Sequence, residues 1–145
     1  MIKITKSYKE TIDLGERIAS FLNTGDILLL KGDLAGGKTT FTKGIGKGLG
    51  VKSIINSPTF TILKSYDGKD IKLHHIDAYR LAESDYDLGF DELEEDGVMV
   101  IEWPEYYQPL PKEYLELDFK YIDDDTREIT IIPHGDHYKK IIEEI

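Results

Sequence analysis

Residues 27–39 place an apolar run directly before a glycine-rich loop, and this stretch constrains the fold more than any other. The run is Ile-Leu-Leu-Leu-Lys, and the residues after it fit the pattern Gly-x-x-x-x-Gly-Lys-Thr. In α/β proteins, a buried strand that ends in such a loop delivers the loop to the edge of a sheet, where a helix follows. The stretch therefore predicts an α/β fold with a phosphate-binding loop.

The residues after the loop have the period of an amphipathic helix that begins at Lys38. Phe41, Ile45 and Leu49 are spaced four residues apart, which places them on one helical face that can pack on a sheet. Gly50 is a suitable residue to end the helix. Because a strand precedes the motif and a helix follows it, phosphate binding is favoured over a chance match in a glycine-rich turn.

Recognition of a triphosphate requires many hydrogen-bond donors close to negatively charged oxygens. Glycines allow backbone N–H groups to approach phosphates that side chains would block. Lys38 can reach the outer phosphates as a point charge, and the Thr39 hydroxyl is placed to bind Mg²⁺. The residues expected to contact the nucleotide through this loop are Gly32, Asp33, Leu34, Ala35, Gly36, Gly37, Lys38, Thr39 and Thr40.

Length and composition limit the class of protein. With 145 residues and no Pro-, Gly- or Ser-rich linker, we expect a single domain spanning residues 1–145. The chain has no cysteine, which excludes disulfides and thiolate metal sites and favours an intracellular address. No signal peptide and no apolar run of membrane-spanning length is visible, so we expect a soluble cytoplasmic protein without a membrane partner.

The net charge of −10 is concentrated in one segment. Residues 81–111 contain ten Asp and Glu and no Lys or Arg, whereas the rest of the chain is balanced, with 18 charges of each sign. Such a segment repels nucleic acid and attracts basic surfaces, so a role in nucleic-acid metabolism would run through a protein partner. A solvated face without a partner is the alternative.

Hydrophobic periodicity and turn residues predict the remaining elements. Ser7 and Glu10 have the spacing of a capping box at a helix start, and the apolar run 98–101 is typical of a strand buried on both faces. The other predicted elements are a helix at 8–22, a strand at 27–31, a hairpin of 59–66 and 71–76, an acidic helical segment at 78–95, a second hairpin of 114–122 and 127–132, and a C-terminal helix. We expect a mostly parallel central sheet with flanking helices and antiparallel hairpin additions.

Phosphoryl chemistry also requires carboxylates near the phosphate loop, and two follow predicted strands. Glu102 comes directly after the buried run, at the edge where α/β proteins bind ligands, so we expect it to coordinate Mg²⁺. Its alternative is a surface residue at a strand end. Asp77 follows the predicted strand 71–76 and is either a water-orienting or metal-coordinating carboxylate, or the N-cap of the next helix. The residues alone leave both alternatives for Asp77 open.

Two further residues have two interpretations each, and a third bears on charge at the site. Thr59 follows a Ser-Pro dipeptide and either directs its hydroxyl to the γ-phosphate or Mg²⁺ as a switch residue, or closes a local Ser/Thr turn. His75 either forms a pair of metal ligands with Asp77 or packs in the core. Arg80 is one of only three arginines. Unless Arg80 reaches the site, charge stabilisation there is sparse, and we expect slow turnover without a partner.

These motifs resemble, in their order and spacing, those of the bacterial TsaE family, also called YjeE. The matching stretches are Gly32-Asp33-Leu34, Gly37-Lys38-Thr39-Thr40, Ser57-Pro58-Thr59-Phe60, His75-x-Asp77-x-Tyr79-Arg80-Leu81, Leu88-Gly89 and Glu102-Trp103-Pro104. The resemblance covers nearly the whole chain. It implies a P-loop ATPase that acts with the TsaB and TsaD proteins in making threonylcarbamoyladenosine beside the tRNA anticodon. It also implies that ATP binding and hydrolysis reset the TsaD-containing complex, with tRNA contacted only indirectly.

The same resemblance assigns roles to individual residues. The implied roles are Mg²⁺ binding for Thr39 and Glu102, catalysis for Lys38, Asp77 and Glu102, a switch function for Thr59, and a contact on the adenine side of ATP for Thr11. One departure is visible at residues 35–36, where the family usually has Gly-Ala and this chain has Ala-Gly. Both residues are small and the essential glycine and lysine remain, so the departure affects loop conformation rather than phosphate binding.

Three other functions are compatible with a phosphate loop. A small-molecule kinase would need an acceptor pocket and usually an arginine-rich lid, and residues 81–111 contain no arginine. A regulatory GTPase would need the Asn-Lys-x-Asp run that recognises guanine, which the chain lacks. A nucleotide-gated binding module would use the acidic segment for docking and would keep its function after loss of turnover.

Overall fold

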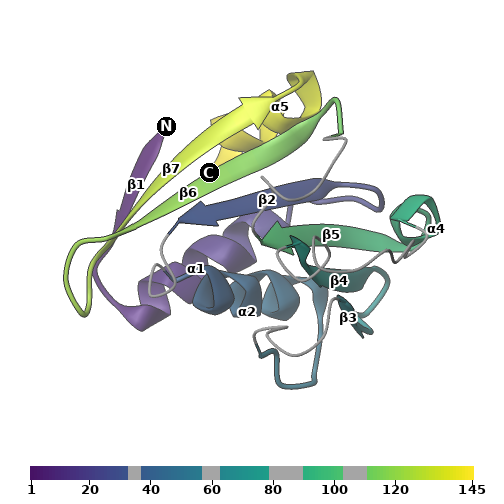
Figure 1. Ribbon diagram of the computed structural model, residues 1–145, viewed down its shortest axis with the longest axis horizontal. Helices are drawn as coiled ribbons and strands as arrows, with labels where there is room; N and C mark the ends of the chain where they lie inside the picture. The colour runs from purple at the N-terminus through teal and green to yellow at the C-terminus, as the bar shows by residue number, and fades with distance from the viewer. Residues whose placement is uncertain (33–36, 57–62, 79–89, 103–110) are drawn as a thin grey trace.

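The computed structural model describes residues 1–32, 37–56, 63–78, 90–102 and 111–145. Its strands form one seven-stranded sheet (Figure 1). The strands are β1 (Ile2–Thr5), β2 (Ile27–Gly32), β3 (Leu63–Tyr66), β4 (Lys72–Asp77), β5 (Gly97–Glu102), β6 (Tyr114–Tyr121) and β7 (Arg127–His134). The helices are α1 (Tyr8–Ala19), α2 (Lys38–Leu49), α4 (Phe90–Glu94) and α5 (Asp136–Glu144). Within these ranges, no helix has the length and apolar character needed to cross a membrane.

The centre of the sheet is parallel and its two sides are antiparallel. The strand order is β1-β7-β6-β2-β5-β4-β3, in which β6, β2, β5 and β4 pair in parallel. Antiparallel partners flank them: β3 beside β4 on one side, and β7 and then β1 beside β6 on the other. Because parallel strands run in the same direction, the carboxyl ends of the four central strands meet at one edge. The predicted fold class, an α/β fold with a mostly parallel central sheet, flanking helices and antiparallel hairpin additions, is confirmed: the four central strands are parallel and the three outer strands are antiparallel.

Strand β2 is buried on both faces, as its apolar run predicts. Its alternate residues belong to two separate cores. Leu28 and Leu30 pack with residues of α1, α2 and α5 on one face of the sheet. Ile27 and Leu29 pack on the opposite face with residues of β4, β5 and α4. The phosphate loop therefore leaves the most enclosed part of the sheet.

Helices α1 and α2 lie side by side against one face of the sheet (Figure 1). Two glycines allow their backbones to come close. A Cβ atom on Gly44 would lie 2.1 Å from the carbonyl oxygen of Ile12, and one on Gly15 would lie 2.4 Å from that of Phe41. The Phe41 side chain is itself fully buried. This close packing fixes α2, and with it the position of the helix start at the carboxyl edge of the sheet.

Three elements differ from the sequence predictions, and one of them is β7, which runs to His134 rather than to residue 132. The predicted strand 59–66 and the predicted acidic helical segment 78–95 lie partly outside the described residues. Strand β1 was not predicted: it is an edge strand whose Ile2 and Ile4 side chains are 61% and 47% exposed, so no buried apolar pattern marks it. Helix α1 ends at Ala19 rather than at residue 22. The Ser20 hydroxyl donates a hydrogen bond to the Arg17 carbonyl, and the next backbone bonds span three residues instead of four, which ends the α-helix early.

Candidate functional site

The carboxyl edge of the sheet brings the predicted site residues together. Strand β2 ends at Gly32, where the phosphate loop begins, and α2 begins beyond the loop at Lys38. Glu102 ends the neighbouring strand β5, and Asp77 is its register partner at the end of β4. Since neighbouring strands lie about 4.8 Å apart, the ends of three strands place Gly32, Glu102 and Asp77 within a short distance along one edge.

Backbone geometry at both ends of the phosphate loop requires glycine. Gly32 has a φ of 123°, and a Cβ atom there would lie 2.1 Å from the carbonyl oxygen of Phe119. Gly37 has a φ of 97° and occupies the N-cap position of α2, where no side chain caps the helix. The first backbone N–H groups of a helix have no partner within it and carry the positive end of the helix dipole. The start of α2 therefore has the donors and the charge that an anion requires.

The Lys38 side chain is held at the start of α2. It is only 4% exposed, and its Nζ atom donates a hydrogen bond of 3.1 Å to the carbonyl oxygen of Gly32. The Lys38 side chain therefore connects the two ends of the phosphate loop, because it starts at α2 and bonds the last residue of β2. Burial of a charged ammonium is costly without compensation, which is typical of a functional group rather than a surface lysine.

Two carboxylates at this edge are also buried. Glu102 is 6% exposed and Asp77 is 9% exposed. The Glu102 carboxylate accepts a hydrogen bond of 2.9 Å from Nε2 of His75, whose ring is fully buried. Because an ionised carboxylate only accepts, Nε2 carries the proton, and the buried Nδ1 has no partner among the residues that the structure describes. His75 therefore fixes the orientation of Glu102.

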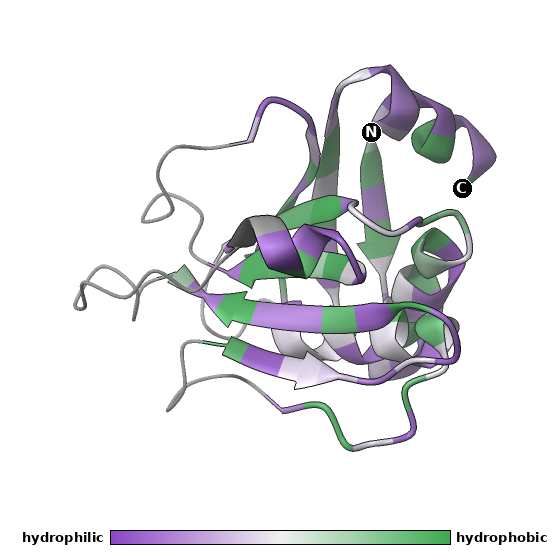
Figure 2. Cartoon of the chain, turned by 90° about the vertical axis from the view of Figure 1, so that its right-hand side faces the viewer, coloured by the Kyte–Doolittle hydropathy of each residue, from purple (hydrophilic) through white to green (hydrophobic). Residues whose placement is uncertain are grey.

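Strand β4 is unusual because it is both buried and polar, and the hydrophilic bands along it are visible in Figure 2. Its two histidines face opposite sides of the sheet and have different hydrogen-bond partners. His74 bonds through Nδ1 to the Ser65 hydroxyl and through Nε2 to the Asp96 carboxylate, each at 2.7 Å. The hydrogen bond from His74 lowers the pKa of Asp96. His74 links β3 and β4 to the turn between α4 and β5, whereas His75 bonds Glu102 at the carboxyl edge.

A small pocket lies next to the phosphate loop on the opposite side of β2 from Glu102. It encloses about 80 Å³. Three segments form it: the start of α1, the start of α2 and the β6–β7 turn. The lining residues are Ser7, Tyr8, Thr11, Gly37, Thr40, Asp124, Asp125 and Arg127. The pocket therefore adjoins the phosphate loop at its helical end.

The structure places the other predicted residues as follows. Thr11 and Thr40 both line this pocket. Thr11 is buried, and its hydroxyl lies 2.8 Å from that of Thr5. Thr39 lies in the first turn of α2, next to Lys38. The predicted site residues outside the described ranges are Asp33, Leu34, Ala35, Gly36 and Thr59, and Arg80 and Trp103 lie outside them as well.

Two residues near the site, His75 and Arg127, have contacts that the sequence analysis did not predict. His75 was expected to bind metal with Asp77 or to pack in the core; it is fully buried, as the second alternative predicts, and it also donates a hydrogen bond to Glu102. In the described part of the chain, no group of three or more His, Asp or Glu side chains is arranged to hold a metal ion. Arg127 was not expected at the site, yet its side chain packs over Gly37. For His75, its position two residues before Asp77 on one strand face was an available signal, whereas the sequence near Arg127 contains none.

The arrangement defines the class of protein: a mixed α/β protein with a seven-stranded sheet, flanking helices and a glycine-rich loop at the sheet edge where α/β folds bind ligands. A family model described as "Threonylcarbamoyl adenosine biosynthesis protein TsaE" matches residues 5–129. The chain therefore belongs to the TsaE family, whose members take part in tRNA threonylcarbamoyladenosine biosynthesis.

Individual relatives agree with this assignment. The chain is 43% identical over 143 residues to the TsaE protein of Bacillus subtilis, a match that covers 97% of this chain and 90% of the relative. It is 39% identical to TsaE of Treponema pallidum, with 88% and 97% covered. The crystal structure of YdiB from Bacillus subtilis superposes with a TM-score of 0.84 at 39% identity, covering 99% of this chain and 92% of that one.

Proposed function

We propose that this chain is a Mg²⁺-dependent ATPase that supports tRNA threonylcarbamoyladenosine biosynthesis in the cytoplasm together with TsaB and TsaD. One observation carries the proposal: the buried Lys38 at the start of α2 lies at the same sheet edge as two buried carboxylates, Asp77 and Glu102. Phosphate binding alone would not require two buried acids beside the phosphate loop. Membership in the TsaE family supports the pathway, and this cluster supports hydrolysis.

The residues present fit a magnesium nucleotide. The N-terminus of α2 lacks a side-chain cap and Lys38 is within reach of its own loop, so both are suited to hold phosphate oxygens. Mg²⁺ bound to a nucleotide usually takes only one or two protein ligands, the rest being phosphate oxygens and water. Thr39 and Glu102 would supply those two ligands. When bound, the ion would neutralise charge on the outer phosphates.

Each residue of the proposed site then has a defined role. Asp77 orients the attacking water and accepts its proton, because it is a buried carboxylate beside the Glu102 position. Lys38 stabilises negative charge on the outer phosphates. His75 holds Glu102 in the orientation that metal binding requires. Thr11 lies in the pocket that we assign to the adenosine part of ATP, and Thr59 keeps its predicted switch role.

The decisive measurement is steady-state hydrolysis of ATP and of GTP in the presence of Mg²⁺, by the chain alone and after addition of a purified TsaB–TsaD pair. We expect slow, ATP-selective turnover that rises with the pair, and no rise with the Asp77→Asn variant. The acidic segment 81–111 is then the first surface to test for docking on the pair. Unchanged turnover with a pair of confirmed activity would contradict the partnered ATPase and favour a small-molecule kinase.

A further inference from the structure

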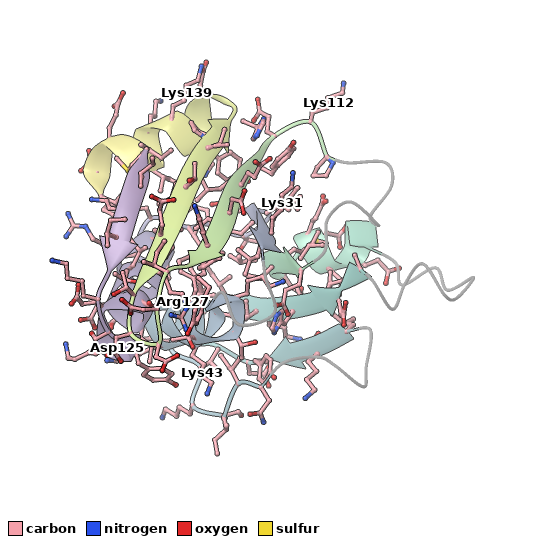
Figure 3. All side chains as sticks on the ribbon, turned by 60° about the vertical axis from the view of Figure 1, so that its left-hand side comes forward. Lys31, Lys43, Lys112, Asp125, Arg127 and Lys139 are labelled. Carbon is pink, nitrogen blue, oxygen red and sulfur yellow. The ribbon has the colours of Figure 1, made fainter. Side chains whose placement is uncertain are left out.

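The β6–β7 turn brings one arginine close to Gly37, at the helical end of the phosphate loop. We propose that Arg127 is the residue that binds the inner, α-phosphate of the nucleotide and so sets nucleotide affinity without taking part in hydrolysis. This inference rests on the proposed ATPase function and deepens it by dividing the site into a binding side and a reacting side. Figure 3 shows Arg127 and Asp125 at the end of the β6–β7 hairpin, beside α2.

The first observation is that the Arg127 side chain lies close to Gly37, in the same pocket. A Cβ atom built on Gly37 would lie 3.5 Å from Cγ and 3.7 Å from Nε of Arg127. In phosphate loops, backbone groups at this end of the loop surround the α- and β-phosphates, while the lysine reaches outward to the β- and γ-phosphates. A guanidinium beside Gly37 and Thr40 is therefore next to the inner phosphate.

The second observation is an unused donor. The Nε atom of Arg127 is buried and has no hydrogen-bond partner among the described residues. Burying a charge-bearing N–H without a partner is unfavourable, so such a group is suited to receive one from a ligand. Phosphate oxygens match the planar guanidinium better than any other common anion except carboxylates.

The turn holds this side chain before any ligand arrives. Nη1 of Arg127 donates to the carbonyl oxygens of Asp123 and Thr126, and the guanidinium carbon lies 4.7 Å from the ring centre of Tyr121. The turn itself is closed by the Asp123 carboxylate, which accepts from the backbone N–H groups of Asp125 and Thr126 at 3.0 and 2.8 Å. These bonds lower the pKa of Asp123. The guanidinium is thus oriented by the protein alone.

The charges around the pocket also fit this assignment. Arg127 is the only positively charged side chain among the described residues that line the pocket, which also include the carboxylates of Asp124 and Asp125. Asp124 already accepts a hydrogen bond from the Tyr121 hydroxyl. Carboxylates repel phosphates, so a nucleotide that enters here needs the Arg127 cation at its inner phosphate. The two acids are better suited to ribose hydroxyls or to an amino group.

The sheet order separates Arg127 from the chemistry. The β6–β7 turn lies on one side of β2, whereas Glu102 and Asp77 lie on the other, at the ends of β5 and β4. A bond made to the inner phosphate is the same before and after loss of the γ-phosphate. Interactions that are equal in the ground state and the transition state change affinity and leave the chemical rate unaltered.

The test compares Arg127→Gln and Arg127→Lys with Arg17→Lys, a control arginine that donates to the Glu144 carbonyl on the exposed surface. Dissociation constants are measured for MgATP, MgADP and inorganic pyrophosphate, together with kcat for ATP. We expect Arg127→Gln to weaken ATP and ADP about 10- to 100-fold and equally, with a smaller loss for Arg127→Lys. Pyrophosphate binding and kcat should stay within about twofold of wild type.

Three results would overturn the inference. Unchanged ATP and ADP affinity would show that Arg127 makes no contact, and an equal loss of pyrophosphate binding would show that it acts by shaping the phosphate loop. A loss confined to kcat would place it on the reacting side. If Arg127→Gln does not fold, Arg127→Lys alone decides, because it keeps the charge and lacks the Nε–H donor. Failure of the wild-type chain to bind ATP would instead refute the proposed function.

Discussion

The two sides of strand β2 at the carboxyl edge are built in different ways. On the side of β4 and β5, the site groups are strand residues, and Asp77, Glu102 and His75 are all nearly inaccessible to solvent. On the side of β6 and β7, the pocket is lined by helix starts and by a turn that contains exposed acids. Rigid, dry surroundings strengthen electrostatic effects on a reaction, while turns and helix ends supply many donors for binding. We therefore assign chemistry to the first side and nucleotide affinity to the second.

The largest effect is expected from Lys38, which lies between the two sides. Lys38→Ala should abolish measurable ATP binding, because it removes the buried ammonium beside the loop and leaves no replacement charge. An ATP titration followed by calorimetry measures this directly. Lys47→Ala is the matched control, since Lys47 is on the same helix and forms a surface ion pair with Glu16. ATP binding that survives in Lys38→Ala would refute the assignment of the phosphate loop.

Asp77 provides the test of the reacting side. Asp77→Asn keeps the size of the side chain but removes the charge, so it should leave the ATP dissociation constant within about threefold and reduce kcat by about 100-fold or more. Single-turnover hydrolysis and ATP binding are measured on the same preparation. Turnover near the wild-type rate would mean that Asp77 is a helix cap and not a catalytic group.

Much of this edge could be predicted from the sequence because the relevant patterns are local. The apolar run before the phosphate loop predicted where the loop begins, and the helical spacing of apolar residues after it predicted where the loop ends. Helix α2 begins at Lys38, as predicted. The same logic placed Glu102 and Asp77, because each follows a buried run and parallel strands end at one edge. Their common location therefore required no knowledge of long-range contacts.

The remaining features depend on pairings between distant parts of the chain. Arg127 approaches Gly37 only because β6 pairs in parallel with β2 and then turns back at the same edge. Strand β1 pairs with β7, with Thr5 opposite Arg127, and the isoleucine side chains of β1 are exposed. Neither contact leaves a periodic signal in the residues that make it, so sequence patterns alone could not predict them.

The two histidines of β4 allow a narrower test of the comparison. His75→Phe removes the hydrogen bond to Glu102 and should raise the Mg²⁺ concentration needed for half-maximal ATPase activity by about 10-fold, as is usual when the partner of a metal ligand is lost. His74→Phe is the control: it breaks the bonds to Ser65 and Asp96 on the opposite face and should lower stability without changing the Mg²⁺ requirement. A Mg²⁺ requirement that shifts equally in both variants would show that His75 acts only through packing.

The smallest effect on function is expected at the opposite end of β2, where α5 is attached. The Tyr138 hydroxyl accepts a hydrogen bond of 2.9 Å from the backbone N–H of Ile27, and burial raises the pKa of Tyr138 to about 12. A group whose pKa is raised by folding gives full stability below its unfolded pKa and loses it as pH rises toward the folded value. Stability should therefore fall between about pH 10 and pH 12.

Tyr138→Phe isolates this titration from those of the other tyrosines. At pH 7 the variant should be less stable by about 1 kcal/mol, because Ile27 loses its acceptor, while ATPase activity is unchanged. Between about pH 10 and pH 12 the gap should close, because only the wild type must keep a buried phenol protonated. Urea unfolding of both proteins across this range measures the gap. A constant gap would show that the phenol titrates normally, and a loss of ATPase activity at pH 7 would mean that the amino end of β2 communicates with the site.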